Sequence, residues 1–89
     1  MTKFEDILKE LNEIYEKKNA DYGNSFEDSL NKYYILPTVL RLTEKITRLE
    51  GLYLREGQGL VKDESIEDTL KDIANYAIIT VKWLKNKKE

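Results

Sequence analysis

Apolar residues recur at three- and four-residue steps along four stretches of the chain, and this is the spacing of one face of an α-helix. No stretch alternates with the two-residue period of a strand. The four stretches are residues 3–18, residues 25–34, a stretch from Pro37 to about Leu54, and a stretch that begins at Asp63 or Ser65. The pattern therefore predicts a small antiparallel all-α helical bundle, and the length of 89 residues predicts a single domain over residues 1–89.

The periodic apolar residues are expected to form the buried side of each helix. They are Phe4, Ile7, Leu8, Leu11, Ile14 and Tyr15, then Phe26, Leu30, Tyr33 and Tyr34, then Val39, Leu42, Ile46, Leu49 and Tyr53, and finally Ile66, Leu70, Ile73, Ala77, Val81 and Leu84. Thr2 and Ser25 are the expected N-caps of the first two helices, and Pro37 is expected in the first turn of the third. Turn-forming residues at 19–24 and glycines within 55–62 predict connections between the helices.

The chain is short for the core that it must complete. A chain of 89 residues buries only about 60–65% of the surface that its unfolded form exposes. We therefore expect a homo-oligomer, either a dimer or a tetramer. The sequence has no secretory signal pattern and no apolar run of membrane length, which predicts a cytoplasmic protein without membrane contact. The net charge of −2 predicts no general affinity for nucleic acid.

The residue types that are missing limit the chemistry. The sequence contains no cysteine and no histidine. Thiol chemistry, disulfides, imidazole acid–base catalysis and the usual zinc ligands are therefore excluded. Carboxylate, amide, hydroxyl and basic side chains remain, and oxygen ligands of this kind suit a hard ion such as Mg²⁺.

An acidic row runs along the last predicted helix. Glu64, Asp68, Asp72 and Asn75 are spaced at i, i+4, i+8 and i+11, on nearly the opposite side from the expected core. Carboxylates one turn apart can share a divalent ion. Acids that favour the positive end of a helix are the alternative, but they do not explain Asp72 and Asn75, which are poor helix formers in a helix interior. Apolar residues continue beside the row, so we expect a second surface there that is covered by a helix, a subunit or a ligand. These residues are Tyr76, Ile79 and Trp83.

A basic row runs along the third predicted helix. Arg41, Lys45 and Arg48 are spaced at i, i+4 and i+7, with Glu44 beside them. Three cations on one face can bind a polyphosphate. The alternative is a solvated face on which Glu44 and Arg48 pair one turn apart. A triphosphate with Mg²⁺ needs both signs of charge, so the two rows are expected to face a common cleft.

The segment between Lys18 and Phe26 is a third candidate. Gly23 permits a left-handed turn, and the rings of Tyr22 and Phe26 could stack on a base. A simple turn between two helices, with both aromatic rings in the core, is the alternative.

Together these three segments resemble the family called nucleotide modification associated domain, type one. The residues that carry the resemblance are Lys18, Asp21, Tyr22, Gly23, Asn24, Ser25, Phe26, Arg41, Glu44, Lys45, Arg48, Leu49, Glu64, Ser65, Asp68, Thr69, Leu70, Asp72, Asn75, Tyr76 and Ala77. The family is largely bacterial and phage-borne, and it is similar to the all-α nucleoside triphosphate pyrophosphatases, the MazG-like and dimeric dUTPase group. The resemblance implies an oligomeric helical core that binds a nucleotide with Mg²⁺.

The resemblance also implies roles for single residues. Glu44, Asp68 and Asp72 would hold Mg²⁺, and Glu64 would orient a water molecule. Phosphate-binding and base- or sugar-binding residues would complete the site. The former are Arg41, Lys45, Arg48 and Lys18, and the latter are Asp21, Tyr22, Asn75 and Tyr76. The pyrophosphatases carry four carboxylates on two helices, whereas the earlier helix offers only Glu44 here, so the carboxylate set is incomplete.

Three hypotheses follow. The first is an enzyme that hydrolyses a canonical or modified nucleoside triphosphate to the monophosphate and pyrophosphate. The second is a non-catalytic protein that sequesters a nucleotide or binds a host protein, as a phage accessory protein would. The third is a helical adaptor whose charged rows only pair two subunits. It would be favoured if Lys45 or Arg48 were found saturated by Asp68 or Asp72 with no room between them.

Overall fold

The computed structural model describes residues 1–22, 24–56, 59 and 63–87, and for residues 20–22 and 56 it describes the backbone alone. The described residues form α1 (Phe4–Tyr22), α2 (Ser25–Tyr33), α3 (Leu36–Glu56) and α4 (Asp63–Lys87). All regular structure in this part of the chain is helical, which confirms the all-α prediction. None of these helices has an apolar stretch long enough to cross a membrane.

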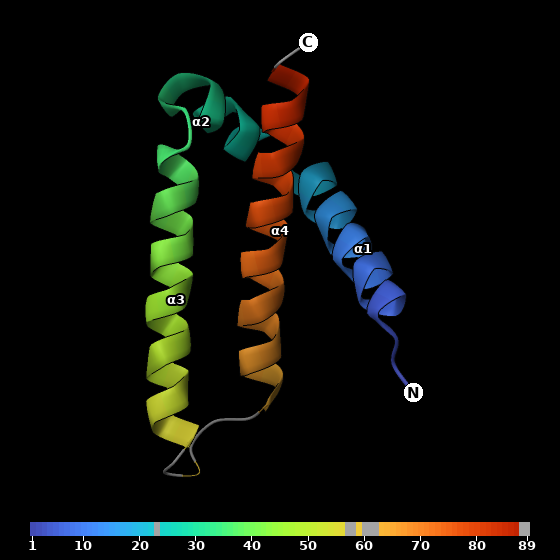
Figure 1. The fold of residues 1–89 in the computed structure, drawn as a ribbon, viewed down its shortest axis with the longest axis vertical. Coiled ribbons are helices and arrows are strands. Elements are labelled where there is room, and N and C mark those ends of the chain that lie inside the picture. The colour runs from blue at the N-terminus through green and yellow to red at the C-terminus, as the bar shows by residue number, and fades with distance from the viewer. Residues whose placement is uncertain (23, 57–58, 60–62, 88–89) are drawn as a thin grey trace.

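The helices α3 and α4 form a long antiparallel hairpin (Figure 1). The helix α1 lies along the other side of α4 at an angle, and the short α2 crosses the end of the hairpin where α4 finishes. The principal extents of 48 × 30 × 23 Å describe an elongated molecule. The helix α4 is therefore the element that all other helices contact.

The helix boundaries differ from the prediction at three places. The helix α1 continues to Tyr22, four residues beyond the expected end. Lys3 rather than Thr2 occupies the cap position, because the Lys3 carbonyl accepts the first helical hydrogen bonds, from the N–H groups of Asp6 and Ile7. The Lys3 N–H in turn donates to the Asp6 carboxylate at 2.9 Å. Ser25 is the first residue of α2, so Asn24 occupies the cap position, and it makes no side-chain cap hydrogen bond.

Other boundary predictions hold or lie outside the described residues. Pro37 is the second residue of α3, as expected, since a proline in the first turn removes no intrahelical hydrogen bond. The helix α2 ends at Tyr33 because Tyr34 has a φ of 57°, a left-handed conformation that a helix cannot continue. The expected left-handed turn at Gly23 lies outside the described residues.

Threonine hydroxyls bridge the hairpin. The buried Thr80 hydroxyl donates to the Tyr76 carbonyl at 2.7 Å, so it accepts the hydrogen of Thr38, whose oxygen lies 2.7 Å away. The Thr69 hydroxyl donates to the Ser65 carbonyl, at 2.8 Å, in the same way. Burying these hydroxyls costs little stability, because each hydroxyl hydrogen has an acceptor. The helices thus pack closely along a line of small polar residues.

The buried core is small and differs from the predicted one. The buried large apolar side chains are Leu11, Leu30, Leu52 and Trp83. The prediction was wrong for ten residues that are exposed in this chain, namely Phe4, Leu8, Tyr33, Tyr34, Val39, Ile46, Tyr53, Leu70, Ala77 and Val81. On α4 the buried positions are Thr69, Thr80 and Trp83, on the side that was expected to be a second surface. The face of α4 that packs against α3 is therefore rotated away from its most apolar line.

Candidate functional site

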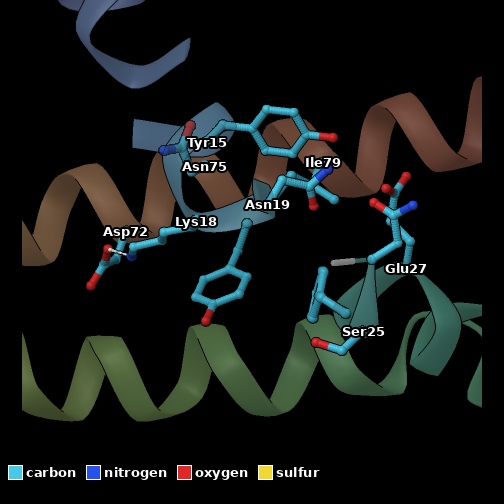
Figure 2. Close-up of a pocket in the computed structure, with 11 residues that line it drawn as sticks. Tyr15, Lys18, Asn19, Ser25, Glu27, Asp72, Asn75 and Ile79 are labelled. Atoms are coloured by element: carbon cyan, nitrogen blue, oxygen red, sulfur yellow. Dashed lines mark hydrogen bonds and ion pairs between the residues drawn. The ribbon is translucent and has the colours of Figure 1, made fainter. Parts of the chain in front are cut away.

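A pocket of about 190 Å³ opens where the C-terminal half of α1, the start of α2 and the middle of α4 meet (Figure 2). Polar groups lie at its two ends and aromatic rings lie between them. Its lining residues are Tyr15, Lys18, Asn19, Asn24, Ser25, Phe26, Glu27, Asp72, Asn75, Tyr76 and Ile79. The pocket therefore combines a ring-binding surface with charge.

One end of the pocket is lined by Asp72 and Lys18, and Lys45 contacts the same carboxylate from outside the pocket lining. Lys45 of α3 lies 3.0 Å from Asp72, and Lys18 of α1 lies 3.2 Å from it. Figure 2 shows the Lys18 side chain extended towards Asp72. The side chains of Lys45 and Asp72 are each 27% exposed, whereas that of Lys18 is 60% exposed. Two cations thus converge on one carboxylate at the pocket mouth.

The lysines determine the charge state of this carboxylate. Partial burial acts to raise the pKa of Asp72, but the hydrogen bonds and positive charges of Lys45 and Lys18 together outweigh that effect. The pKa of Asp72 therefore lies below its ordinary value, and the side chain is ionised at neutral pH. The cluster carries a net positive charge, which favours an incoming anion.

The middle of the pocket has an aromatic wall. The rings of Phe26 and Tyr76 lie 5.0 Å apart between centroids, at an angle of 59°. Lys82 donates to the Tyr15 hydroxyl at 3.0 Å and lies 3.4 Å from the Glu27 carboxylate. The hydrogen bond with Tyr15 is the largest cause of a raised Lys82 pKa, and the charge of Glu27 adds to it. These contacts hold the start of α2 and the tyrosine ring in place on α4.

Behind the aromatic wall a groove of about 650 Å³ separates α2 from α3. It shares Phe26 and Tyr76 with the pocket and is also lined by Arg41 and Glu44. Arg41 and Glu44 pair with each other at 3.3 Å, and both side chains are more than half exposed. The predicted phosphate-binding residues are therefore divided between two sites: Arg41 lies in the groove with Glu44, and Lys18 lines the pocket.

The structure brings together part of the predicted set. Lys45 of the basic row and Asp72 of the acidic row lie 3.0 Å apart across the hairpin, in direct contact. This contact is the one that favours the adaptor hypothesis. Arg48 does not pair with Asp68 but donates from its Nε to the Thr69 hydroxyl at 3.3 Å. Glu64 and Asp68 are exposed and do not line the pocket.

The base- and sugar-binding prediction has a mixed outcome. Asn75 and Tyr76 line the pocket, but the Asn75 amide donates to the Leu11 carbonyl at 3.2 Å and so helps to hold α1 on α4. The side chains of Asp21 and Tyr22 lie outside the described residues.

The expected metal ligands are not gathered within one chain. Among the residues that the structure describes, no three carboxylates lie close enough to hold a metal ion. Glu44 pairs with Arg41, Asp68 is exposed, and two lysines occupy Asp72. An Mg²⁺ site needs several oxygen ligands around one point, so these three carboxylates do not fit that ion as the chain is arranged here.

Sequence reasoning missed several pocket residues. Tyr15 was assigned to the core and Lys82 was given no role, yet Tyr15 lines the pocket and Lys82 lies beside it. The sequence did contain a signal for Lys82. Ile79 and Lys82 follow Asn75 at the same three- and four-residue spacing as the acidic row, so they lie on the same side of the helix. Extending the row along the helix would have indicated the α1-facing side of α4.

Comparison with known proteins adds one finding. No curated protein and no solved structure matched the chain. A family model matches residues 18–82, which include both charged rows and most of the pocket lining. The chain belongs to the family of nucleotide modification associated domain 1.

Proposed function

We propose that this chain binds a nucleotide in the pocket between α1, α2 and α4. The observation that carries the proposal is the pocket itself, in which a wall of aromatic rings leads to Lys18 and Asp72, with Lys45 beside them on the same carboxylate. Aromatic rings offer stacking surfaces for a base, and lysine ammonium groups attract phosphate. The membership of a family associated with nucleotide modification supports the same ligand class.

The size of the pocket suggests how the ligand is divided. Pockets that enclose whole small molecules measure about 300–1,000 Å³, whereas this one measures about 190 Å³. Only part of a nucleotide therefore enters. We place the base or sugar against Tyr15 and Tyr76, with the phosphates outside, where Lys18 exchanges Asp72 for a phosphate oxygen.

Binding without hydrolysis is the form that we favour for a single copy. The carboxylate with the best position, Asp72, is paired with two lysines, and the described carboxylates do not form a metal site. Hydrolysis with Mg²⁺ stays a prediction and is tested in the same experiments. A protein that sequesters a canonical or modified nucleotide needs the pocket and its lysines but no activated water.

Isothermal titration with nucleoside mono-, di- and triphosphates, with and without Mg²⁺, tests the proposal. Lys18→Gln removes one phosphate contact and should weaken binding of the triphosphate about tenfold, since a charge-assisted hydrogen bond contributes roughly 1.5–3 kcal/mol before solvent screening. Lys17→Gln is the matched control, because Lys17 is an exposed lysine of the same helix and does not line the pocket. Equal weakening by both variants would point to general charge attraction and would overturn the proposed site. Pyrophosphate release in the same samples would show hydrolysis.

A further inference from the structure

The α3–α4 hairpin leaves one apolar face uncovered. We define the hairpin face by Val39, Ile46 and Tyr53 on α3 and by Leu70, Ala77 and Val81 on α4. Each of them is exposed, and Tyr53 is 73% exposed. Both helices contribute to one surface, because a shallow apolar depression joins Ile46 and Tyr53 of α3 to Ile66 of α4.

The helix α1 does not cover this face. It is held on α4 by Glu10 with Lys71, by the carbonyl of Leu11 with Asn75, and by Tyr15 with Lys82. At about 100° per residue, positions 71, 75 and 82 point roughly 120° away from positions 70, 77 and 81 around the helix. The hairpin face and the α1 contact are therefore on different sides of α4, and the pocket lies with α1.

The spacing on the hairpin face is that of a helical bundle seam. The apolar positions alternate steps of three and four residues, so equivalent positions recur every seven. On α3 they are Val39, Leu42, Ile46, Leu49 and Tyr53. On α4 they are Ile66, Leu70, Ile73, Ala77 and Leu84, and the position between the last two is taken by the buried Thr80. In a four-helix bundle such seams meet at the centre, and each helix buries its seam against the other three. The described part of the chain places only two helices on this seam, so two more are required to bury it.

A second copy of the same chain fits the charges along the face. One line of α4 reads acidic at its start, apolar in the middle and basic at its end. It consists of Asp63, Glu67, Leu70, Ala74, Ala77, Val81 and Lys85. If the two copies run antiparallel, Asp63 and Glu67 of each line come near Lys85 of the other copy. Glu67 pairs with Lys71 of its own chain at 2.6 Å, but its side chain is 66% exposed and can also approach Lys85. The midpoint between Glu67 and Lys85 falls beside Ala77, where a small side chain allows the helices to approach closely.

The area is of the order that a dimer needs. Val39, Ile46, Tyr53, Leu70 and Val81, each about half exposed or more, would supply apolar area on the order of 400 Å² per copy. Stable interfaces bury about 800 Å² per partner, and the half-buried residues and the charged rim extend the patch towards that value. The core within one copy has only four buried large apolar side chains among the described residues, so the dimer would also complete the core.

We propose that two copies of this chain pair through the hairpin face, with α4 antiparallel to α4 of the second copy around Ala77, to form a four-helix bundle. The two-fold axis lies across the helices, because an axis along them would bring the acidic ends together. The pocket stays open in this dimer, so the proposal does not depend on the ligand.

Sedimentation equilibrium at micromolar concentration tests the assembly. We expect twice the 10.5 kDa mass of the chain. Ile46→Glu and Leu70→Glu should each shift the protein to the mass of one chain, whereas Phe4→Glu, at an exposed apolar residue of α1, should leave the dimer intact. Circular dichroism shows whether each variant folds. If Ile46→Glu or Leu70→Glu unfolds the chain, the surface variant Lys85→Glu still tests the interface, and it should weaken the dimer at least tenfold. A wild-type protein with the mass of one chain would overturn the proposal.

A cysteine variant tests the arrangement. The chain has no cysteine of its own, so Ala77→Cys introduces a single thiol near the proposed axis. Under mild oxidation it should form a covalent dimer in high yield, whereas Asn12→Cys on the exposed side of α1 should not. A dimer that resists Ile46→Glu, or that links equally through both cysteines, would show that another surface mediates the assembly.

Discussion

Replacing Asp72 by asparagine separates two roles that a carboxylate at the pocket mouth can have. In the structure Asp72 lies 3.0 Å from Lys45 and 3.2 Å from Lys18. An asparagine keeps the shape of the side chain and one acceptor oxygen but removes the charge. Both lysines then remain near the pocket without their anionic partner. The sign of the change in nucleotide affinity depends on whether Asp72 competes with phosphate or holds a metal ion.

The cost of Asp72→Asn in stability is modest. Exposed ion pairs contribute about 0.2–1 kcal/mol each, and solvent screens the Lys18 pair more than the Lys45 pair because the Lys18 side chain is 60% exposed. Losing both pairs while keeping one hydrogen bond should therefore lower the free energy of unfolding by about 1 kcal/mol. For a chain of this length, that shifts the Tm down by roughly 4–8 °C at constant protein concentration.

The expected gain in binding follows from Coulomb's law. A phosphate that reaches Lys18 comes within about 6 Å of the Asp72 carboxylate, and an effective dielectric constant of about 40 then gives a repulsion of roughly 1.4 kcal/mol. Removing that repulsion should tighten binding without Mg²⁺ by about five- to tenfold. The increase should shrink as ionic strength rises, since salt screens charges at a partly exposed site.

Isothermal titration measures whether Asp72→Asn raises or lowers the nucleotide affinity. The wild type and the variant are titrated with one nucleoside triphosphate, in buffer with chelator and in buffer with Mg²⁺. Glu13→Gln is the matched control, because it removes a negative charge from the exposed face of α1 away from the pocket. Weaker binding of the variant in chelator would refute competition between Asp72 and phosphate. Weaker binding only with Mg²⁺ would show that Asp72 holds the metal ion after all.

The remaining predictions concern stability. Leu30→Ala should lower the free energy of unfolding in urea by about 2–4 kcal/mol, because Leu30 is fully buried, whereas Leu54→Ala at an exposed position should change it by less than about 0.5 kcal/mol. Thr38→Val and Thr80→Val should show a coupling of about 1 kcal/mol in a double-mutant cycle, and additive effects would contradict their hydrogen bond. Because the pKa of Asp72 is lower in the folded than in the unfolded state, its contribution is present above the ordinary carboxyl pKa and is lost as the pH falls through the folded value. Urea titrations at pH 6 and pH 3 should therefore show a smaller acid loss in Asp72→Asn than in the wild type.

The helices themselves could be predicted from the sequence because their signals are local. The three- and four-residue apolar period identified α3 and α4, and Pro37 marked the first turn of α3. The spacing of the acidic and basic rows is a property of single helices, so it too could be derived without a tertiary structure. The resemblance to nucleotide modification associated domains used the same residues and is confirmed by the family match.

The choice of buried face could not be predicted in this way. The period shows that α4 has an apolar line, but it does not show which neighbour covers that line. In the chain α3 packs against the side that carries Thr69 and Thr80, and the apolar line through Leu70 and Val81 stays exposed. Burial depends on contacts between residues far apart in sequence, and for this face it depends on whether a second copy is present.

What the sequence by itself determined is the set of helices, the charges on each of them and the family. Only the tertiary structure decided which charges meet and where a pocket forms. Lys18 and Lys45 reach Asp72 because the separate angles of α1 and α3 on α4 bring their side chains to one point. Those angles arise from side-chain packing across three helices, whereas a helical period contains information about one helix alone.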